Sequence, residues 1–446
     1  MTTTDEDLHD DVRPGRQQLA LLGAILVMVP GVILRFAHAD LAHPLEALLF
    51  GMAIIGAAFL LSWAAEVAQL DISAGLAIAV LAFIAVLPEY AVDLVFAVKG
   101  GNSFEAAGST GACPGPPLEG GGLGESPCSL ALANMTGANR LLIGIGWSMV
   151  VFIAWWRWRK RGQPERGREI VLERSHSVEL SFLLLATLYS LTLPLKHSIT
   201  LIDAAVLVTI FLLYTIRISR APAEEPHLVG PARWLGSFRV ASRRTAVISL
   251  FIGAAGVILL TAEHFAEALV ASGESLGVSE FLLVQWLAPL ASEAPELLVA
   301  GLYAWRLNTS AGLGTLVSSK VNQWTLLVGT LPIAFAIASG GTHGLPIVGQ
   351  QQEELFLTAA QSLFAVAILM NLSMSVREAG TLFGLFVIQF AVGAVGPESI
   401  HDEVRIVTGI IYVVLALVLF ARQGSLVRRL LVDGFSTPYD QLDDPR

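Results

Sequence analysis

Four acidic side chains lie inside apolar stretches of this sequence, where charged groups are rare. Glu89 and Asp93 are four residues apart and Glu293 and Glu296 are three apart, so each pair shares one face of a helix. A charge at the centre of a membrane helix costs about 2.5–3.5 kcal/mol on insertion scales, and such residues usually mark ion pathways. Four carboxylates in an apolar bundle cannot all remain ionised unless cations compensate them. The pattern therefore predicts a buried cation site.

Oxygen-bearing side chains accompany these acids, and oxygen is the donor that hard cations such as calcium prefer. Neither Cys nor His accompanies them, which disfavours a zinc or copper site. Arg140 and Lys320 have no acceptor atom, so we expect them to be charge partners of the carboxylates. The charge left over would match one divalent cation, two monovalent cations or two protons. The predicted ligands are Glu89, Asp93, Glu293, Glu296, Ser292, Thr136, Ser319, Asn139 and Asn322.

The composition requires a membrane. The chain has 446 residues, of which 54% are hydrophobic and only 14% charged, with a mean hydropathy of +0.67, whereas soluble proteins carry about 25% charged residues. A soluble enzyme, a nucleic-acid-binding protein and a disordered scaffold are thereby excluded. Because backbone polar groups must be satisfied inside lipid, we predict an all-α polytopic membrane protein. Twelve spans are predicted, at 19–36, 45–65, 72–98, 130–156, 178–195, 199–217, 245–268, 278–304, 312–338, 355–374, 378–396 and 403–421.

The distribution of Lys and Arg predicts the orientation of these spans. With the N-terminus in the cytoplasm, the inner loops and tails hold 21 of the 27 Lys and Arg residues and the outer loops hold four. Positive residues accumulate on the cytoplasmic side, so we expect both termini in the cytoplasm and the protein in the cell membrane. The loop 99–128 then faces an oxidising exterior, where a disulfide between Cys113 and Cys128 is plausible.

Two segments of the chain resemble each other. LPEYAVDLVFAV (87–98) is followed by ALANMTGANRLLIGIG (131–146), and APELLVAGLYAW (294–305) is followed by TLVSSKVNQWTLLVG (315–329). The predicted topology orients the two copies oppositely, and inverted repeats with broken helices are typical of secondary transporters. Pro88 and Pro295 are expected in the body of a helix, where each would free a carbonyl oxygen for an ion.

These stretches resemble the two repeats of the calcium/cation antiporter superfamily, which includes the sodium/calcium exchangers. The resemblance is carried by LAFIAVLPEYAVDLVFA (81–97), NMTGAN (134–139), LGVSEFLLVQWLAPLASEAPELLVA (276–300) and SSKVNQ (318–323). It implies that Glu89 and Glu296 correspond to the two family glutamates that bind transported calcium. Asn139 and Asn322 would take the place of the asparagines that close the second helix of each repeat, and Ser292 would fall within the second motif.

The resemblance also implies two inverted five-helix repeats plus about two extra helices. The expected organisation is a cytoplasmic acidic tail (1–18), an extra helix (19–44), a first repeat (45–217), a cytoplasmic linker (218–244), a second repeat (245–396), an extra helix (397–421) and a cytoplasmic tail (422–446). The chain departs from the family motif at Ala85, Val86 and Leu87, where hydroxyl ligands are lost, and at Lys320, which replaces a glycine. Sodium sites would be lost or filled, and a Lys moving between a carboxylate and water would favour proton coupling.

The expected function is a cation antiporter that works by alternating access and exchanges calcium for sodium or protons. A sodium/proton antiporter is the first alternative, and a transport-inactive sensor or assembly protein of the same fold is another. A membrane enzyme using paired carboxylates is disfavoured, because no nucleophile–base pair or His cluster accompanies them. No cofactor is predicted beyond the transported calcium, sodium or protons. The expected partners are membrane lipid and inorganic cations, with no nucleic acid. The sequence pattern leaves the oligomeric state open.

Overall fold

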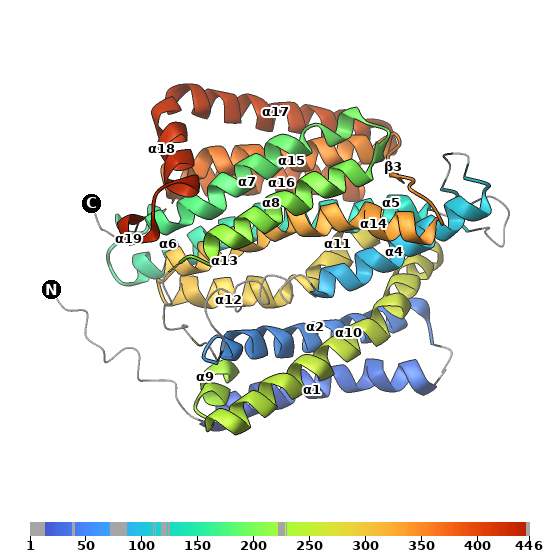
Figure 1. Ribbon diagram of the computed structural model, residues 1–446, viewed down its shortest axis with the longest axis horizontal. Coiled ribbons are helices and arrows are strands. Elements are labelled where there is room, and N and C mark those ends of the chain that lie inside the picture. The colour runs from blue at the N-terminus through green and yellow to red at the C-terminus, as the bar shows by residue number, and fades with distance from the viewer. Residues whose placement is uncertain are drawn as a thin grey trace.

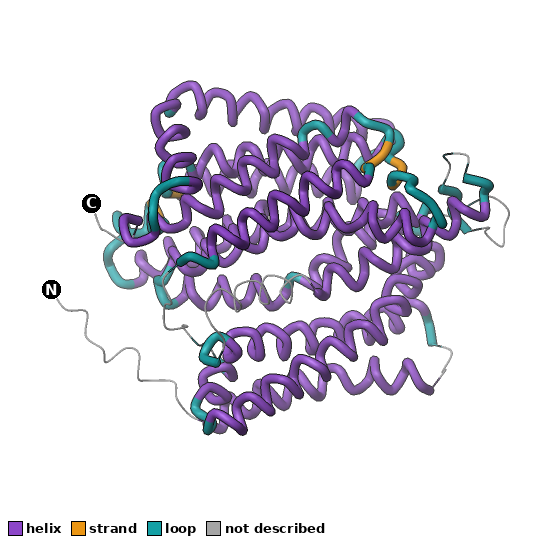
Figure 2. The backbone as a smooth tube through the Cα atoms, viewed as in Figure 1, coloured by secondary structure: helices purple, strands orange, loops and turns teal. Residues whose placement is uncertain are grey.

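In the computed structural model, the chain forms a bundle of long helices whose axes lie roughly along the long axis of the molecule (Figures 1 and 2). The structure describes residues 14–37, 41–71, 87–109, 111, 113–116, 123, 125–221, 228 and 230–442. Within these residues, nine helical stretches are long and apolar enough to cross a membrane. The predicted span 72–98 is described only from Leu87 onwards, so Ala85 and Val86 lie outside the described residues.

The helices follow the predicted spans closely. The first half contains α1 (Pro14–Ala37), α2 (His43–Ala68), α4 (Leu87–Ala106), α5 (Pro127–Leu141), α6 (Ser148–Lys160), α7 (Ser177–Ser190) and α8 (Leu201–Ile218). After the short α9 (Pro231–Gly236), the second half contains α10 (Val240–Leu276), α11 (Glu280–Ser292), α12 (Ala294–Trp305), α13 (Thr309–Asn322), α14 (Val328–Ala338), α15 (Gln350–Leu369) and α16 (Val376–Val395). The chain ends with α17 (His401–Arg422), α18 (Gly424–Phe435) and α19 (Tyr439–Leu442).

The predicted span 278–304 is wrong as a single helix. It is divided at Glu293, which ends α11 and directly precedes α12. Pro295 occupies the first turn of α12, whereas the residues directly before Leu87 lie outside the described part of the chain. The expectation that Pro295 lies in the body of a helix is therefore also wrong, and the expectation for Pro88 stays a prediction. A proline fits the first turn of a helix because its missing N–H has no partner there in any case.

The two halves of the bundle share two local features. A π-helical turn follows α5 (η2, Leu142–Trp147) and another follows α13 (η5, Gln323–Leu327), so α5–η2–α6 and α13–η5–α14 are each one interrupted helix. The last helices of the two halves, α8 and α16, both begin with a capping box, formed by Thr200 with Asp203 and by Ser375 with Glu378. The same sequence logic therefore builds each half.

Two short antiparallel strand pairs tie the halves together. β1 (Glu169–Val171), between α6 and α7, pairs with β4 (Ser373–Ser375), which precedes α16. β2 (Ser198–Ile199), between α7 and α8, pairs with β3 (Leu345–Pro346), which precedes α15. Each pair joins a loop of one half to a loop of the other, so the strands fix how the two halves meet.

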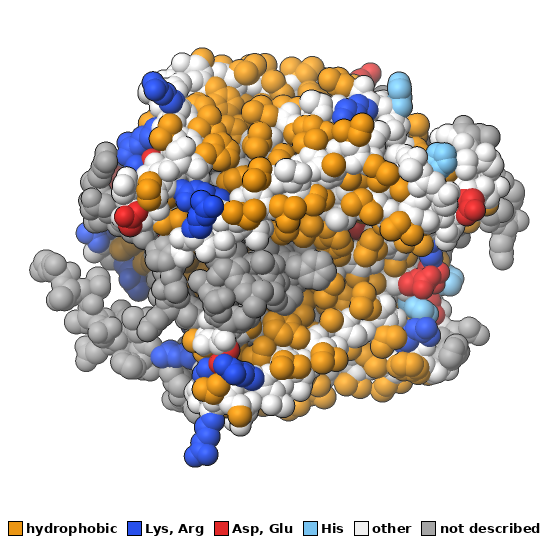
Figure 3. All heavy atoms as spheres, viewed as in Figure 1, with side chains coloured by type: hydrophobic (Ala, Val, Ile, Leu, Met, Phe, Trp, Pro, Cys, Tyr) orange, Lys and Arg blue, Asp and Glu red, His pale blue; other side chains and the backbone are white. Residues whose placement is uncertain are grey.

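The surface agrees with a membrane location. On the face shown in Figure 3, hydrophobic side chains cover the band between the two ends of the helices. Most of the Lys and Arg side chains visible there gather at the end where α1 begins and α19 ends. A charged end beside an apolar band is the pattern expected where helices leave the bilayer.

The hydrophobic interior consists of two clusters. One joins α1, α2, α9, α10 and α11 with one face of α4 and α5, and the other joins the remaining long helices, including α12. Because α11 belongs to the first cluster and α12 to the second, the break at Glu293 lies where the two clusters meet.

The loop predicted at 99–128 is shorter than expected, because α4 continues to Ala106 instead of ending near residue 98. Gly100 and Gly101 lie within this helix. At each of them the missing side chain lets another part of the chain approach closely. A Cβ on Gly101 would lie 2.7 Å from the carbonyl oxygen of Phe335 in α14. A Cβ on Gly100 would lie 2.7 Å from the sulfur of Cys128, which forms a disulfide with Cys113.

We predict that Gly137→Ala destabilises the protein, because α5 and α11 touch through their backbones at this position. A Cβ on Gly137 would lie 1.8 Å from the carbonyl oxygen of Gln285, and overpacking of this kind costs about 1–3 kcal/mol or more. Gly253→Ala is the matched control, because it lies within α10 with nothing within 4 Å. The control should be neutral or stabilising by up to about 1 kcal/mol. Thermal unfolding in detergent measures both, and equal effects would contradict the close approach.

A second prediction concerns Asp71, which joins the end of α2 to the start of α10. Arg243 donates to it at 2.7 and 2.9 Å and Arg244 at 3.2 Å, and the hydrogen bond from Arg243 lowers the pKa of Asp71 below its ordinary value of 3.8. The stabilisation is therefore present above pH 4 and is lost as the pH falls through the lowered pKa. We expect Asp71→Asn to lower the stability at pH 7 by about 1–2 kcal/mol.

The same difference in stability between wild type and Asp71→Asn should shrink as the pH falls below 3.8, because the wild-type carboxylate then takes up a proton. Melting temperatures of the two proteins, measured side by side from pH 7 to pH 3, check this. A difference that stays constant over that range would show that the ion pair contributes nothing.

Candidate cation-binding site

Three of the predicted carboxylates meet inside the bundle. One oxygen from each of Glu89, Glu293 and Glu296 lies within 4.8 Å of the other two. Glu89 and Glu293 are buried, with exposed fractions of 2% and 0%, and Glu296 is partly buried. Residues more than 200 positions apart are therefore brought together, and their like charges repel one another in a region with little water.

The backbone around this three-carboxylate cluster favours negative charge. Glu89 lies in the first turn of α4, Glu296 lies in the first turn of α12, and Glu293 forms the break between α11 and α12. Figure 1 shows α12 running from near the middle of the bundle to one end and the described part of α4 running to the opposite end. Each helix N-terminus carries a partial positive charge, which stabilises a carboxylate placed there.

Four buried oxygen atoms, three from the cluster and one from the predicted ligand Asn322, have no hydrogen-bond donor among the described residues. They are Oε2 of Glu89, Oε2 of Glu293, Oε2 of Glu296 and Oδ1 of Asn322. Buried acceptors are almost always paired in folded proteins, and all four here are oxygens of the kind that bind hard cations. Their arrangement suits a cation held between α4, the α11–α12 break and α13.

Two side chains of the α13–η5 segment supply positive or donor groups. Gln323 donates from Nε2 to Oε1 of Glu293. Lys320 is fully buried and donates from Nζ to the backbone oxygen of Asn139, at 2.7 Å, and to the Oδ1 of the same residue. Lys320 therefore binds the predicted ligand Asn139.

The other predicted ligands lie nearby but make contacts of their own. Asp93 accepts from Nδ2 of Asn134 at 2.7 Å and lies outside the three-carboxylate cluster. The hydroxyls of Thr136 and Ser292 donate to carbonyls of their own helices, Thr136 to Leu132 at 2.7 Å and Ser292 to Ala288 at 3.3 Å. Ser319 is buried on α13 beside Lys320. The hydroxyl oxygens keep lone pairs, so these contacts do not prevent them from binding a cation.

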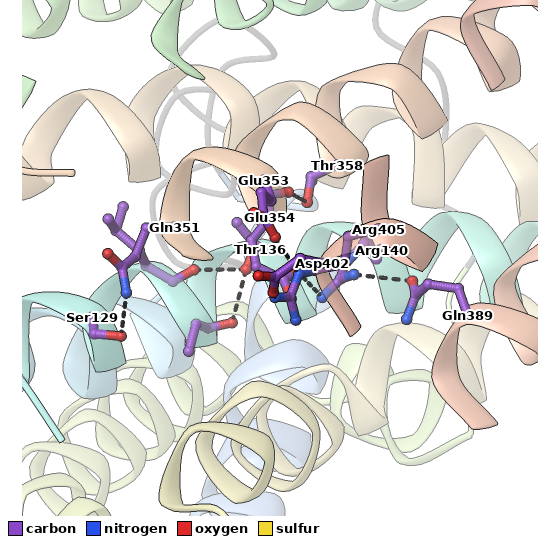
Figure 4. Close-up of polar contacts among 12 residues, drawn as sticks. Ser129, Thr136, Arg140, Gln351, Glu353, Glu354, Thr358, Gln389, Asp402 and Arg405 are labelled. Atoms are coloured by element: carbon purple, nitrogen blue, oxygen red, sulfur yellow. Dashed lines mark hydrogen bonds and ion pairs between the residues drawn. The ribbon is translucent and has the colours of Figure 1, made fainter. Parts of the chain in front are cut away.

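Arg140 does not pair with these carboxylates, which corrects the prediction made from the sequence. Its guanidinium contacts Glu354 of α15 at 2.6 Å and donates to Gln389 of α16 at 2.9 Å (Figure 4). It also lies over the ring of Trp286, 4.9 Å from the centroid. Because Arg140 follows Asn139 by one residue, its side chain leaves the helix in a different direction and reaches α15 and α16 instead.

Glu354 connects this pair to the end of the chain. Arg405 of α17 lies 3.8 Å from Glu354 and donates to Glu353 at 2.9 Å, and it also pairs with Asp402 (Figure 4). An ion-pair network therefore joins α5 to α17, which lies outside the two repeats predicted from the sequence. Glu354 was not singled out from the sequence, because it lies near the polar start of α15 and looks like a surface residue there.

Sequence reasoning also missed Gln323 and Asn134, whose amides contact the site acids. Asn134 opens the NMTGAN segment and Gln323 closes the SSKVNQ segment, so both lie within the motifs that carry the repeat. A search for amide donors next to the intramembrane carboxylates would have found them, because a buried carboxylate needs donors as well as cations.

Comparison with known proteins places the chain among ion exchangers. The family model described as sodium/calcium exchanger protein matches residues 45–219 and 246–395. A crystal structure of the H⁺/Ca²⁺ exchanger CAX is similar, with 40% sequence identity and a TM-score of 0.82, over 96% of this chain and 98% of that one. The search of curated proteins found no match.

A more distant likeness concerns the fold alone. The structure of native YfkE has 15% identity and a TM-score of 0.57, over 84% of this chain and 98% of that chain. The all-helical, multi-pass membrane fold expected from the sequence is confirmed by these matches, and so is the resemblance to the cation antiporters.

We predict that the Arg140–Glu354 pair stabilises the fold only as a pair. The exposed fractions of the two side chains are 1% and 5%, and removing one partner of a buried pair costs about 3–5 kcal/mol, because the other charge is left uncompensated. Arg140→Met and Glu354→Gln should each be strongly destabilising, and the double variant should be clearly less so than their sum. Unfolding in detergent measures the cycle.

The exposed pair of Arg168 with Glu165 provides the control for this cycle, because its side chains are 70% and 72% exposed. Glu165→Gln should change the stability by less than about 1 kcal/mol. Additive effects of Arg140→Met and Glu354→Gln would show that the two side chains do not depend on each other.

Proposed function

The chain belongs to the sodium/calcium exchanger family of membrane cation antiporters, which are transporters and not enzymes, and on this premise we propose that it exchanges calcium for protons. The single observation that carries the proposal is the convergence of Glu89, Glu293 and Glu296 within 4.8 Å. The 40% identity to a protein described as an H⁺/Ca²⁺ exchanger supports this choice of ions.

Calcium suits the cluster because of its charge and its preference for oxygen. Calcium takes six to eight oxygen ligands from carboxylates, amides and carbonyls. The unpaired oxygens of Glu89, Glu293, Glu296 and Asn322 are the primary ligands in this proposal. Ser292, Ser319 and Thr136 lie on the same elements as these residues or on α5, and their hydroxyls would complete the shell.

Protons are the counter-ion because of what happens when calcium leaves. Three carboxylates this close together, in a site with little water, cannot all remain ionised without a cation. Protons on these oxygens would restore the balance, and the next calcium ion would displace them. Calcium and protons then compete for the same atoms, which couples their movement in opposite directions without any covalent chemistry.

Alternating access would use the boundary between the two hydrophobic clusters. The site lies at the α11–α12 break, where the cluster that contains α1, α2 and α10 meets the other. Movement of one cluster against the other would open the site first to one side and then to the other. We place both termini in the cytoplasm of a cell-membrane protein, because the Lys and Arg side chains gather at that end.

The test is calcium uptake into proteoliposomes driven by a pH gradient. Glu89→Gln and Glu296→Gln each remove a charged ligand, and the loss of a charged contact costs about 1.5–3 kcal/mol. We therefore expect the apparent calcium affinity to fall roughly 10- to 100-fold in each variant. The control is Glu263→Gln, since Glu263 on α10 is 57% exposed and pairs with Lys99 rather than with the cluster; its uptake should match wild type.

Uptake that is unaffected by either site substitution would show that the cluster does not bind calcium. Sodium uptake that depends on the pH gradient, in the absence of calcium uptake, would support the sodium/proton alternative. Calcium binding without any flux, measured on the same purified protein, would point to a transport-inactive member of the family.

A further inference from the structure

The buried ammonium of Lys320 is held in a way that resembles the binding of a free cation. Nζ lies 2.7 Å from the backbone oxygen of Asn139 and also contacts the Oδ1 of that residue. The ring of Trp324 lies on another side, 5.3 Å from Nζ to the centroid. A backbone carbonyl, an amide oxygen and an aromatic face are the groups that replace the hydration shell of a monovalent cation inside proteins.

These oxygens bind a side chain of the α13–η5 segment, and the same segment contacts the carboxylate cluster, because Gln323 donates to Glu293. Asn139 on α5 corresponds to Asn322 on α13, 183 residues later in the repeat. The Oδ1 of Asn322 is buried without a donor, whereas the Oδ1 of Asn139 is bonded by Lys320. The two halves therefore offer two equivalent amide oxygens. That of Asn322 has no donor in the described part of the structure, whereas that of Asn139 accepts from the Lys320 ammonium.

No other positive side chain in the described part of the chain takes this place. Arg140, the neighbouring candidate, contacts Glu354 and Gln389 on α15 and α16 (Figure 4). Lys320 lies three residues before Gln323, whose neutral amide donates to Glu293. The fixed positive charge at the transport site is thus supplied by Lys320.

We propose that Lys320 is a tethered cation that fills a monovalent-cation subsite between α5 and α13 and so keeps sodium out of the transport cycle. The inference rests on the proposed calcium/proton exchange and names the residue that sets its ion specificity. A tethered ammonium cannot leave with the substrate, so the subsite contributes charge but no transported ion. The exchanger then moves calcium and protons through the carboxylate cluster alone.

The experiment compares sodium competition in wild type and in Lys320→Gln, reconstituted in proteoliposomes. Calcium uptake by wild type, driven by a pH gradient, should be unchanged by 100 mM sodium chloride relative to choline chloride. In Lys320→Gln the ammonium is removed from the subsite. We therefore expect sodium to inhibit calcium uptake by this variant at concentrations at least tenfold lower than any that inhibit wild type. Lys320→Arg retains the charge and should stay insensitive to sodium.

The matched control is Lys160→Gln. Lys160 also lies over a tryptophan ring, 3.8 Å from the centroid of Trp156, but on an exposed part of α6. Its replacement removes a Lys–Trp contact without opening a buried site, so uptake should remain insensitive to sodium. A new sodium effect in this variant would mean that the response of Lys320→Gln is not specific.

A second measurement decides the question if Lys320→Gln folds but does not transport. Sodium stabilises any folded protein that binds it, so 100 mM sodium should raise the melting temperature of detergent-purified Lys320→Gln and not that of wild type. Lys320→Met, which has no charge and a similar length, is measured in parallel in case the Gln variant does not fold. A sodium effect absent from both variants in both assays would overturn the proposal.

The outcomes also separate this inference from the proposed function. If wild type takes up calcium against protons but the Lys320 variants stay insensitive to sodium, only the tethered-cation inference fails. If wild type already responds to sodium, Lys320 does not exclude it and the inference fails as well. If wild type moves no calcium under a pH gradient, the proposed exchange itself is wrong, and the melting experiment still tests the subsite.

Discussion

The structure depends on holding three carboxylates together where little water can reach them. Repulsion among Glu89, Glu293 and Glu296 would be prohibitive on a continuous apolar helix, so the surrounding backbone has to compensate for it. The chain does so by starting α12 at the cluster, with Pro295 in its first turn and the partial positive charge of its N-terminus beside Glu296. The break at Glu293 and the amide of Gln323 serve the same electrostatic need.

Much of the fold could be predicted because the bilayer limits the possibilities so strongly. Long apolar segments must become helices, and the predicted spans agree with the observed helices except where the chain breaks at Glu293 and where α4 continues to Ala106. Those two errors have one cause, which is that Pro and Gly were interpreted by type alone. Pro295 begins a helix after a break, and Gly101 lies within one because Phe335 packs against it. Only the packing partner decides between such roles.

The candidate site was predictable in its acids and less so in their partners. A carboxylate inside an apolar helix is exceptional, so the position of Glu89 and Glu296 within apolar segments of the sequence identifies them. Which cation faces which acid depends on the direction in which each side chain leaves its helix, and there the prediction for Arg140 was wrong because its partner is Glu354. The ligand roles and the domain bounds stay predictions, since geometry alone does not show which atoms a transported ion contacts.

The two halves have similar helices but differ in the charged residues at equivalent positions. At equivalent positions of the repeat, Gly137 corresponds to Lys320 and Arg140 corresponds to Gln323. Gly137 lets α11 approach to backbone contact, whereas Lys320 fills the space next to Asn139 with a positive charge. A symmetric pair of motifs would offer two equivalent cation sites, and each of these exchanges removes that equivalence. The two copies therefore differ at one equivalent pair of amide oxygens, because that of Asn139 is bonded by Lys320 whereas that of Asn322 has no donor in the described part of the structure.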